Sequence, residues 1–135
     1  MMERNELIQI LRTARSFDDV NQACDRIAET IPAIRIMFEY DQRNHAHQYD
    51  LWEHCVQTVL NLPKSIGDDM VFLAALLHDI GKPVCQQPGR HSEDPNMHYY
   101  GHPRKSMEIV KEQVLPYLYG LGIQLSEAEE YRLLY

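Results

Sequence analysis

The chain has 135 residues, of which 44% are hydrophobic and 24% charged, as in one compact globular domain. Its net charge of −7 argues against a binder of long nucleic acid, because phosphate neutralisation needs clustered lysine and arginine. No apolar run approaches the ~20 residues that span a bilayer, and the polar start is unlike a signal peptide, so we expect no membrane partner.

Three cysteines, Cys24, Cys55 and Cys85, are odd in number and lack CxxC spacing. This pattern indicates neither a disulfide framework nor a zinc ribbon. We therefore expect reduced, mostly structural thiols and a cytoplasmic location.

The first third of the chain is expected to be helical. Apolar residues at helical spacing predict a helix over residues 3–15. Ser16 can cap a second helix, since acidic residues follow it in the first turn, and Pro32 breaks that helix. Residues 33–49 predict an irregular connector with room for one short helix.

Two capped helices follow the connector. Asp50 and Glu53 form a capping-box-like start to a third helix, which Pro63 ends. Asp68 or Asp69 opens a fourth helix, and its composition sets it apart from the others.

The fourth helix ends in an unusual pair. Residues 72–77 are all apolar, and His78 and Asp79 follow them. Gly81 is expected to be the C-cap and Pro83 to prevent continuation, which puts the pair in the last turn. A carboxylate at this negative end of the helix dipole is disfavoured by roughly 0.3–1 kcal/mol. Asp79 therefore predicts a cation nearby.

A polar loop over residues 83–101 is too long to be a mere connection, and such loops are often functional. Pro103 suits the first position of a helix through Val114, with His102 just outside it. Pro116, Gly120 and Gly122 are expected to close this helix.

The C-terminal segment predicts one more helix, because Ser126 and Glu129 match a capping box. No segment shows the alternating pattern of a strand. The predicted fold class is all-α, a single helical bundle.

Three residues make a candidate metal site. His54 lies among apolar residues and is expected to face inward, although a lone histidine of this kind is more often a hydrogen-bonded core residue. His78 and Asp79, about 100° apart on a helix, can both reach a cation between them. The structural alternative is a His–Asp hydrogen bond that ties off the helix end. Mixed His/Asp ligation suits Mn, Fe, Co, Ni or Zn better than Ca, and Mg is also possible.

Further residues are candidates for a second metal or for substrate. His102 is either a surface substitute for an N-cap or a ligand of a second metal or phosphate, and His47 is a weaker candidate for the same role. Lys82, Arg104 and Lys105 are candidates for stabilising charge on a phosphate, although most lysines are simply solvated.

The order of His54 and then His78-Asp79 resembles the HD superfamily of metal-dependent phosphohydrolases, whose commonest form is "HDIGK". The segments "DQRNHAHQYDLWEH", "LLHDIGKP" and "YYGH" are similar, in order and spacing, to the HD domain of bacterial tRNA nucleotidyltransferases. The resemblance covers roughly residues 32–135. It implies a helical fold around a divalent metal, with residues 1–45 as an N-terminal helical extension packed on the core and residues 46–135 as the HD domain.

The resemblance also implies a function. His54, His78 and Asp79 would be metal ligands, and His102 occupies a position used in some branches for a second metal or substrate. The implied reaction is hydrolysis of a small phosphate ester, a nucleotide or a related compound, with Asp79 orienting the metal-activated water and Lys82 stabilising charge. No residue indicates the identity of the substrate or the oligomeric state.

Two departures from the family qualify this expectation. The nucleotidyltransferase catalytic domain has no counterpart here, so the chain is not expected to add CCA. The superfamily completes its site with a distant Asp, and none follows Asp94. We expect a chain truncated before that residue, with water or one of Glu127, Glu129 and Glu130 as alternatives. The rival function is a catalytically silent HD module that binds a nucleotide or a partner protein.

Overall fold

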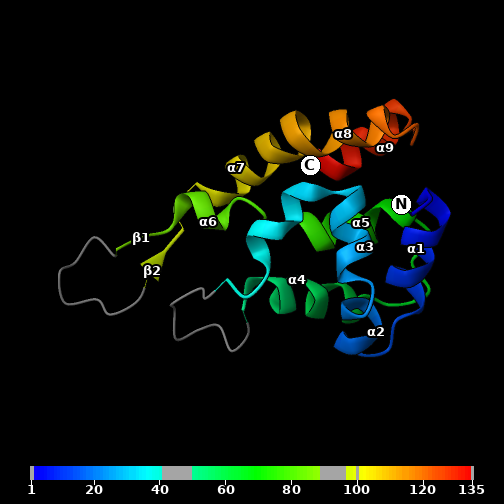
Figure 1. Ribbon diagram of the computed structural model, residues 1–135, viewed down its shortest axis with the longest axis horizontal. Coiled ribbons are helices and arrows are strands. Elements are labelled where there is room, and N and C mark those ends of the chain that lie inside the picture. The colour runs from blue at the N-terminus through cyan, green and yellow to red at the C-terminus, as the bar shows by residue number, and fades with distance from the viewer. Residues whose placement is uncertain (1, 41–49, 89–96, 100, 135) are drawn as a thin grey trace.

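The computed structural model describes residues 2–40, 50–88, 97–99 and 101–134, and these form an all-α protein, as the sequence predicts (Figure 1). The α-helices are α1 (Arg4–Thr13), α2 (Phe17–Asn21), α3 (Cys24–Thr30), α4 (Leu51–Leu60), α5 (Asp69–Leu77), α6 (Lys82–Cys85), α7 (His102–Ile109), α8 (Leu115–Gly120) and α9 (Glu127–Leu134). A 3-10 helix η1 (Pro32–Met37), a π-helical turn η2 (Val110–Val114) and the short strands β1 (Gln87–Pro88) and β2 (Met97–His98) complete the described elements.

Helix α5 lies in the middle of the bundle, with α4 on one side and α9 on the other (Figure 1). Its buried residues include Met70, Phe72, Leu73, Leu76 and Leu77, which explains why this helix lacks a polar face. Helix α1 also packs against α5, so one core receives side chains from both sides of the domain boundary expected at residue 45. The boundary itself stays a prediction. Among the described residues, no helix combines the length and apolarity that a membrane span requires.

The N-terminal helices follow the local signals in part. Helix α1 is confirmed, and the hydroxyl oxygen of Ser16 accepts a hydrogen bond from the backbone N–H of Asp19 at 3.4 Å to cap α2. The predicted second helix is divided into α2 and α3. Pro32 does not simply start an irregular connector: it opens η1, where its missing N–H costs no helical bond. Residues 41–49 of the connector lie outside the described residues.

The starts of α4 and α5 are confirmed. Asp50 accepts a hydrogen bond from the backbone N–H of Glu53 at 2.8 Å, and Asp68 accepts one from that of Met70 at 3.1 Å. Each carboxylate satisfies a donor that the first helical turn leaves without a partner.

The end of α5 differs from the prediction. The helix ends at Leu77, so His78 is its C-cap and Asp79 lies in the following turn. Gly81 is not a left-handed C-cap, because its φ is −80°, and Pro83 does not stop a helix but occupies the first turn of α6. The rule for C-caps failed here because tertiary packing, and not backbone chirality, requires the glycine.

Gly81 lies directly against α7. A Cβ atom at this position would be 2.5 Å from the backbone nitrogen of Ser106 and 2.9 Å from the carbonyl oxygen of His102. The backbone N–H of Gly81 donates to the hydroxyl oxygen of Ser106 at 2.8 Å. The absent side chain therefore lets the turn after α5 approach α7, which brings Asp79 close to His102.

The predicted loop over residues 83–101 contains α6 and a two-stranded antiparallel ribbon. Gln87 pairs with His98 and Pro88 with Met97, and the ribbon extends away from the helices in Figure 1. Strands of two residues cannot show a period-2 pattern, so the sequence carries no strand signal at this place. The all-α class stands.

Helix α7 begins at His102, with Pro103 in its first turn, but Pro116 does not close it. The chain continues through η2 into α8. The wider π-helical turn ends at Val114, two residues before Pro116, whose ring and missing N–H disrupt regular α-helical bonding. Gly122, another of the expected closing residues, has a φ of 86° and follows the end of α8.

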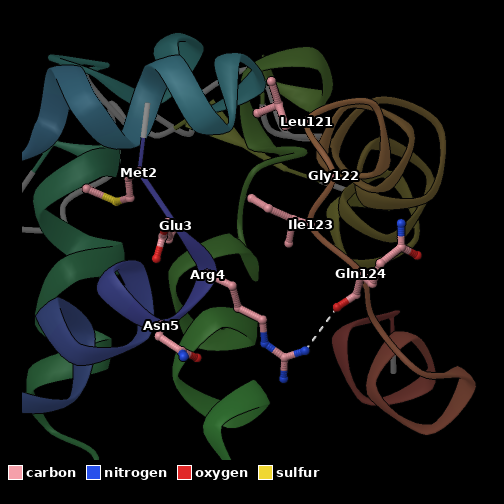
Figure 2. A pocket seen from close by; sticks show the side chains of 8 residues that line it. All are labelled: Met2, Glu3, Arg4, Asn5, Leu121, Gly122, Ile123 and Gln124. Carbon is pink, nitrogen blue, oxygen red and sulfur yellow. Dashed lines mark hydrogen bonds between the residues drawn. The ribbon is translucent and has the colours of Figure 1, made fainter.

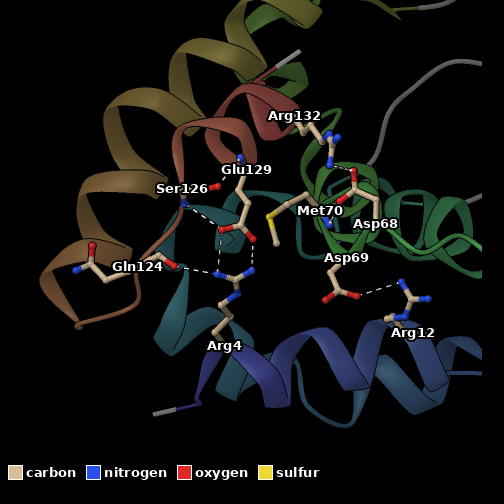
Figure 3. A network of polar contacts seen from close by, with 9 residues as sticks. All are labelled: Arg4, Arg12, Asp68, Asp69, Met70, Gln124, Ser126, Glu129 and Arg132. Atoms are coloured by element: carbon tan, nitrogen blue, oxygen red, sulfur yellow. Dashed lines mark hydrogen bonds and ion pairs between the residues drawn. The ribbon is translucent and has the colours of Figure 1, made fainter.

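Ion pairs fasten α1 and α9 to the start of α5. Arg4 pairs with Glu129 and donates to the carbonyl oxygen of Gln124 at 3.0 Å, beside a cavity of about 440 Å³ (Figure 2). The predicted capping box is confirmed, because Ser126 and Glu129 exchange hydrogen bonds of 2.9 and 3.2 Å (Figure 3). Figure 3 also shows Arg12 beside Asp69 and Arg132 beside Asp68, at 3.2 and 2.6 Å.

Candidate metal centre

Residues at the end of α5 lie between residues of two other helices. His54 is in the middle of α4, which packs along α5, and His102 is the first residue of α7, which packs on α6. His78 and Asp79 stand between them. The sequence predicts that His54 faces inward, and in the structure its imidazole contacts Asp79.

Asp79 is the centre of the cluster. Its Oδ2 atom lies 3.0 Å from Nε2 of His54, 3.0 Å from Nε2 of His78 and 3.3 Å from Nζ of Lys82. Its Oδ1 atom lies 3.0 Å from Nε2 of His102. The side chain is only 6% exposed, so these four groups supply the polar surroundings that water would give a free carboxylate.

Backbone carbonyls orient two of the imidazoles. Nδ1 of His78 lies 2.6 Å from the carbonyl oxygen of Ala75, and Nδ1 of His102 lies 3.0 Å from that of Tyr99. A carbonyl oxygen only accepts, so Nδ1 carries the proton in both rings. In the neutral ring, Nε2 then has a free lone pair. This is the arrangement that prepares histidine for metal ligation.

Two residues of the metal-free cluster, His78 and Asp79, strongly favour their charged forms. Burial lowers the pKa of His78, but hydrogen bonds to Asp79 and Cys55 and the charge of Asp79 outweigh burial and raise that pKa to about 10. Burial raises the pKa of Asp79, but hydrogen bonds from His54 and His78 and the positive charges of His78 and Lys82 hold it well below its usual range. The side-chain donors that face Asp79 therefore stand where a cation would bind.

The donor set fits a divalent ion. One ligand atom each from His54, His78 and Asp79 can be chosen so that all lie within 4.8 Å of one another. Two imidazole nitrogens and one carboxylate oxygen suit Mn, Fe, Co, Ni or Zn, and these atoms alone do not choose among them. The imidazoles of His54 and His78 are 28% and 38% exposed, so the cluster is open to solvent on their side.

Lys82 is buried, unlike most lysines. Its side chain is 5% exposed, and its ammonium group lies over the Tyr99 ring, 5.2 Å from the centroid, besides contacting Asp79. The ammonium is therefore a fixed positive charge inside the cluster.

Arg104 and Lys105 lie apart from the cluster contacts. Both pair with Glu108 along α7, at 3.5 and 3.3 Å, and their side chains are 84% and 48% exposed. His47, the remaining candidate, lies outside the described residues.

Sequence reasoning missed two contributors to the site. Burial raises the pKa of the Cys55 thiol, which hydrogen bonds to His78. Tyr99 orients His102 through its carbonyl oxygen and covers Lys82 with its ring. Adjacency to His54 was a signal for Cys55, whereas the role of Tyr99 depends on contacts that no local pattern encodes.

Comparison with known proteins gives no further identification, because no protein family model, curated protein or solved structure matches the chain.

Proposed function

We propose that the protein is a metal-dependent phosphohydrolase of the HD superfamily type, acting on a small phosphate ester such as a nucleotide. The observation that carries the proposal is the convergence of His54, His78 and Asp79, with ligand atoms within 4.8 Å of one another. A divalent cation held there would supply water activation and polarisation of the phosphoryl group.

The remaining roles belong to the chain's own residues. The Asp79 carboxylate orients the attacking water by accepting its hydrogen bond. The Lys82 ammonium, 3.3 Å from Asp79, contributes fixed positive charge where negative charge builds on the phosphate. His102 faces the other carboxylate oxygen and is the group that a second ion or a phosphate oxygen would meet.

A cavity of about 260 Å³ adjoins His78 and supports a small substrate. Apolar side chains such as Leu77, Val110 and Leu133 line it, and Arg132 and His78 are basic groups at its wall. The volume falls below the range of about 300–1,000 Å³ typical of pockets that enclose whole ligands. It therefore suits one part of a substrate, such as a ring, while the phosphate lies at the metal.

The second candidate is a catalytically silent module that binds a nucleotide or a partner protein. The observation that favours it is that Asp79 already has positive and hydrogen-bonding partners without any metal, including buried Lys82. Such a cluster can serve stability alone. We further propose a reducing, cytoplasmic setting, in which the three free thiols persist.

One experiment separates the two candidates. Protein freed of metal and then loaded with Mn, Ni or Zn is assayed with p-nitrophenyl phosphate, bis-p-nitrophenyl phosphate and a panel of nucleotides. Turnover in the wild type that disappears in the His54→Ala variant supports the hydrolase. Metal binding without turnover of any substrate supports the silent module, and absence of metal binding contradicts the metal site.

A further inference from the structure

We propose that a second site, separate from the metal cluster, binds a small organic cation bearing ammonium groups. The site is a cavity of about 520 Å³ at the start of α4, bounded also by α2 and by the residues after η1. Its chemistry comes from three aromatic residues, Phe17, Phe38 and Trp52, and three acidic residues, Glu39, Asp50 and Glu53.

The aromatic wall is held in a fixed orientation. The rings of Phe38 and Trp52 meet edge to face, with centroids 4.9 Å apart. The indole N–H of Trp52 donates to Oδ1 of Asn21 at 3.0 Å, so the polar edge of the indole is occupied. Phe17 and Phe38 are half-buried and line the cavity. Such rings attract an ammonium group through their negative faces.

The acidic residues leave negative charge available at this wall. No lysine, arginine or histidine is among the described residues that line the cavity. Asp50 caps α4, but within the described part of the chain neither Glu39 nor Glu53 takes part in an ion pair. A cation that enters the cavity therefore meets carboxylates that no basic side chain of the described residues neutralises.

The spacing of these carboxylates indicates an organic cation and not a metal. Among the described residues, the group with ligand atoms close enough to share one metal ion is the His54 cluster, and the cavity's three acids are not such a group. Their charge is spread over a volume within the range of small-molecule pockets. An aliphatic diamine or triamine matches both the separated charges and the apolar surface between them.

Trp52 makes the proposal directly testable, since it is the chain's single tryptophan and lines the cavity. Metal-free protein at low ionic strength is titrated with spermidine and followed by tryptophan fluorescence and by calorimetry. We expect saturable one-to-one binding with a dissociation constant below about 1 mM. Magnesium ion, tested alone, should not reproduce the fluorescence change. No heat and no fluorescence change up to 10 mM spermidine, at roughly ten times that constant, would overturn the proposal.

Charge-neutral variants test the location. Glu39→Gln and Glu53→Gln together should weaken spermidine binding about tenfold, which is the effect of losing about 1.4 kcal/mol. Glu112→Gln, at an exposed position of η2 and outside the cavity lining, removes the same kind of charge and should change little. Equal weakening by the double variant and by the control would show general attraction to an acidic protein, and the site would be given up.

Cys24 gives a readout that does not depend on the glutamate variants. It lines the cavity, whereas Cys85 is a comparably half-buried thiol outside that lining. For each thiol we compare the labelling rate by a cationic methanethiosulfonate with the rate by an anionic one. The cationic-to-anionic rate ratio should be larger for Cys24 than for Cys85. Spermidine should slow labelling of Cys24 selectively. Equal ratios, or equal protection of both thiols, contradict a cation site at this cavity.

Discussion

His102 contacts a different oxygen of Asp79 from the other imidazoles: its Nε2 atom lies 3.0 Å from Oδ1, whereas Nε2 of His54 and of His78 each lie 3.0 Å from Oδ2. A carboxylate can present its two oxygens to different partners. The two sides of Asp79 are therefore separable by mutation, and they make different predictions.

We predict that His54→Ala and His102→Ala affect metal binding differently. His54→Ala removes one of the three grouped ligands and should weaken binding of the first Mn or Zn ion by at least about 100-fold. Losing a residue that only orients a ligand typically weakens metal binding by about 10–100-fold. His102→Ala should keep that ion but lose any second ion and most phosphohydrolase activity. Calorimetry and elemental analysis of the dialysed proteins measure both. Equal loss of the first ion in both variants would contradict this assignment.

Local rules predicted the parts of the fold that local contacts determine. Asp50, Asp68 and Ser126 cap their helices as expected, because a capping hydrogen bond spans two or three residues. The grouping of His54 with His78 came from motif order.

Long-range packing determined what the sequence could not predict. The sequence indicated that Gly81 is a C-cap. In the structure a glycine is needed there because the backbone of α7 lies against it, at Ser106, 25 residues further along the chain. Lys82 looked like a solvated residue able to meet substrate, yet it is buried against Asp79. Arg104 and Lys105 looked equivalent to it and instead pair with Glu108, since the helix face that each position occupies depends on how α7 docks.

Metal affinity should rise with pH. In the metal-free protein the pKa of His78 is raised from 6.5 to about 10, and ligation requires the lone pair on its Nε2 atom. Binding therefore releases a proton from His78, and affinity should increase by up to about tenfold per pH unit between pH 6.5 and 10. Calorimetry in buffers of different ionisation enthalpy counts the released proton.

The stability of the metal-free protein should show the opposite trend. Because the pKa of His78 is raised in the folded state, its protonated form stabilises that state, and this contribution is fully present below pH 6.5, the pKa taken for His78 in the unfolded chain. The contribution is lost as the pH rises through about 10. Urea unfolding with chelator at pH 6.5, 8 and 9.5 measures it. A His78→Gln variant serves as the control and should lose this component of the pH dependence. Identical pH dependence in both proteins would show that His78 is not the responsible group.

Gly81→Ala should destabilise the protein and weaken metal binding together. Its Cβ would lie 2.5 Å from the backbone nitrogen of Ser106, so α7 must shift away from the turn that carries Asp79. Overpacking of this kind costs about 1–3 kcal/mol in the free energy of unfolding. Gly120→Ala is the matched control, because nothing lies within 4 Å of its added methyl group, and it should stabilise by about 0.4–1 kcal/mol. Urea unfolding and a zinc titration of both variants check the prediction, and a neutral Gly81→Ala would contradict it.

The last prediction concerns Asp79→Asn. The helix dipole alone would make this change mildly stabilising in the metal-free protein, because the carboxylate follows the negative end of α5. The contacts of Asp79 indicate the reverse. The substitution leaves the Lys82 ammonium, 5% exposed, without its counter-charge, and breaking a buried pair in this way costs about 3–5 kcal/mol.

The matched control for Asp79→Asn is Asp69→Asn, the same chemical change at a carboxylate that is 48% exposed and paired with Arg12. Exposed pairs contribute about 0–1 kcal/mol, so this variant should unfold almost as the wild type does. Adding Lys82→Met to Asp79→Asn should recover part of the loss, since the unpaired buried charge is then removed. Chelator-treated proteins compared by urea unfolding decide the matter. If Asp79→Asn costs no more than Asp69→Asn, Asp79 does not organise the cluster, and the metal-site proposal loses its central ligand.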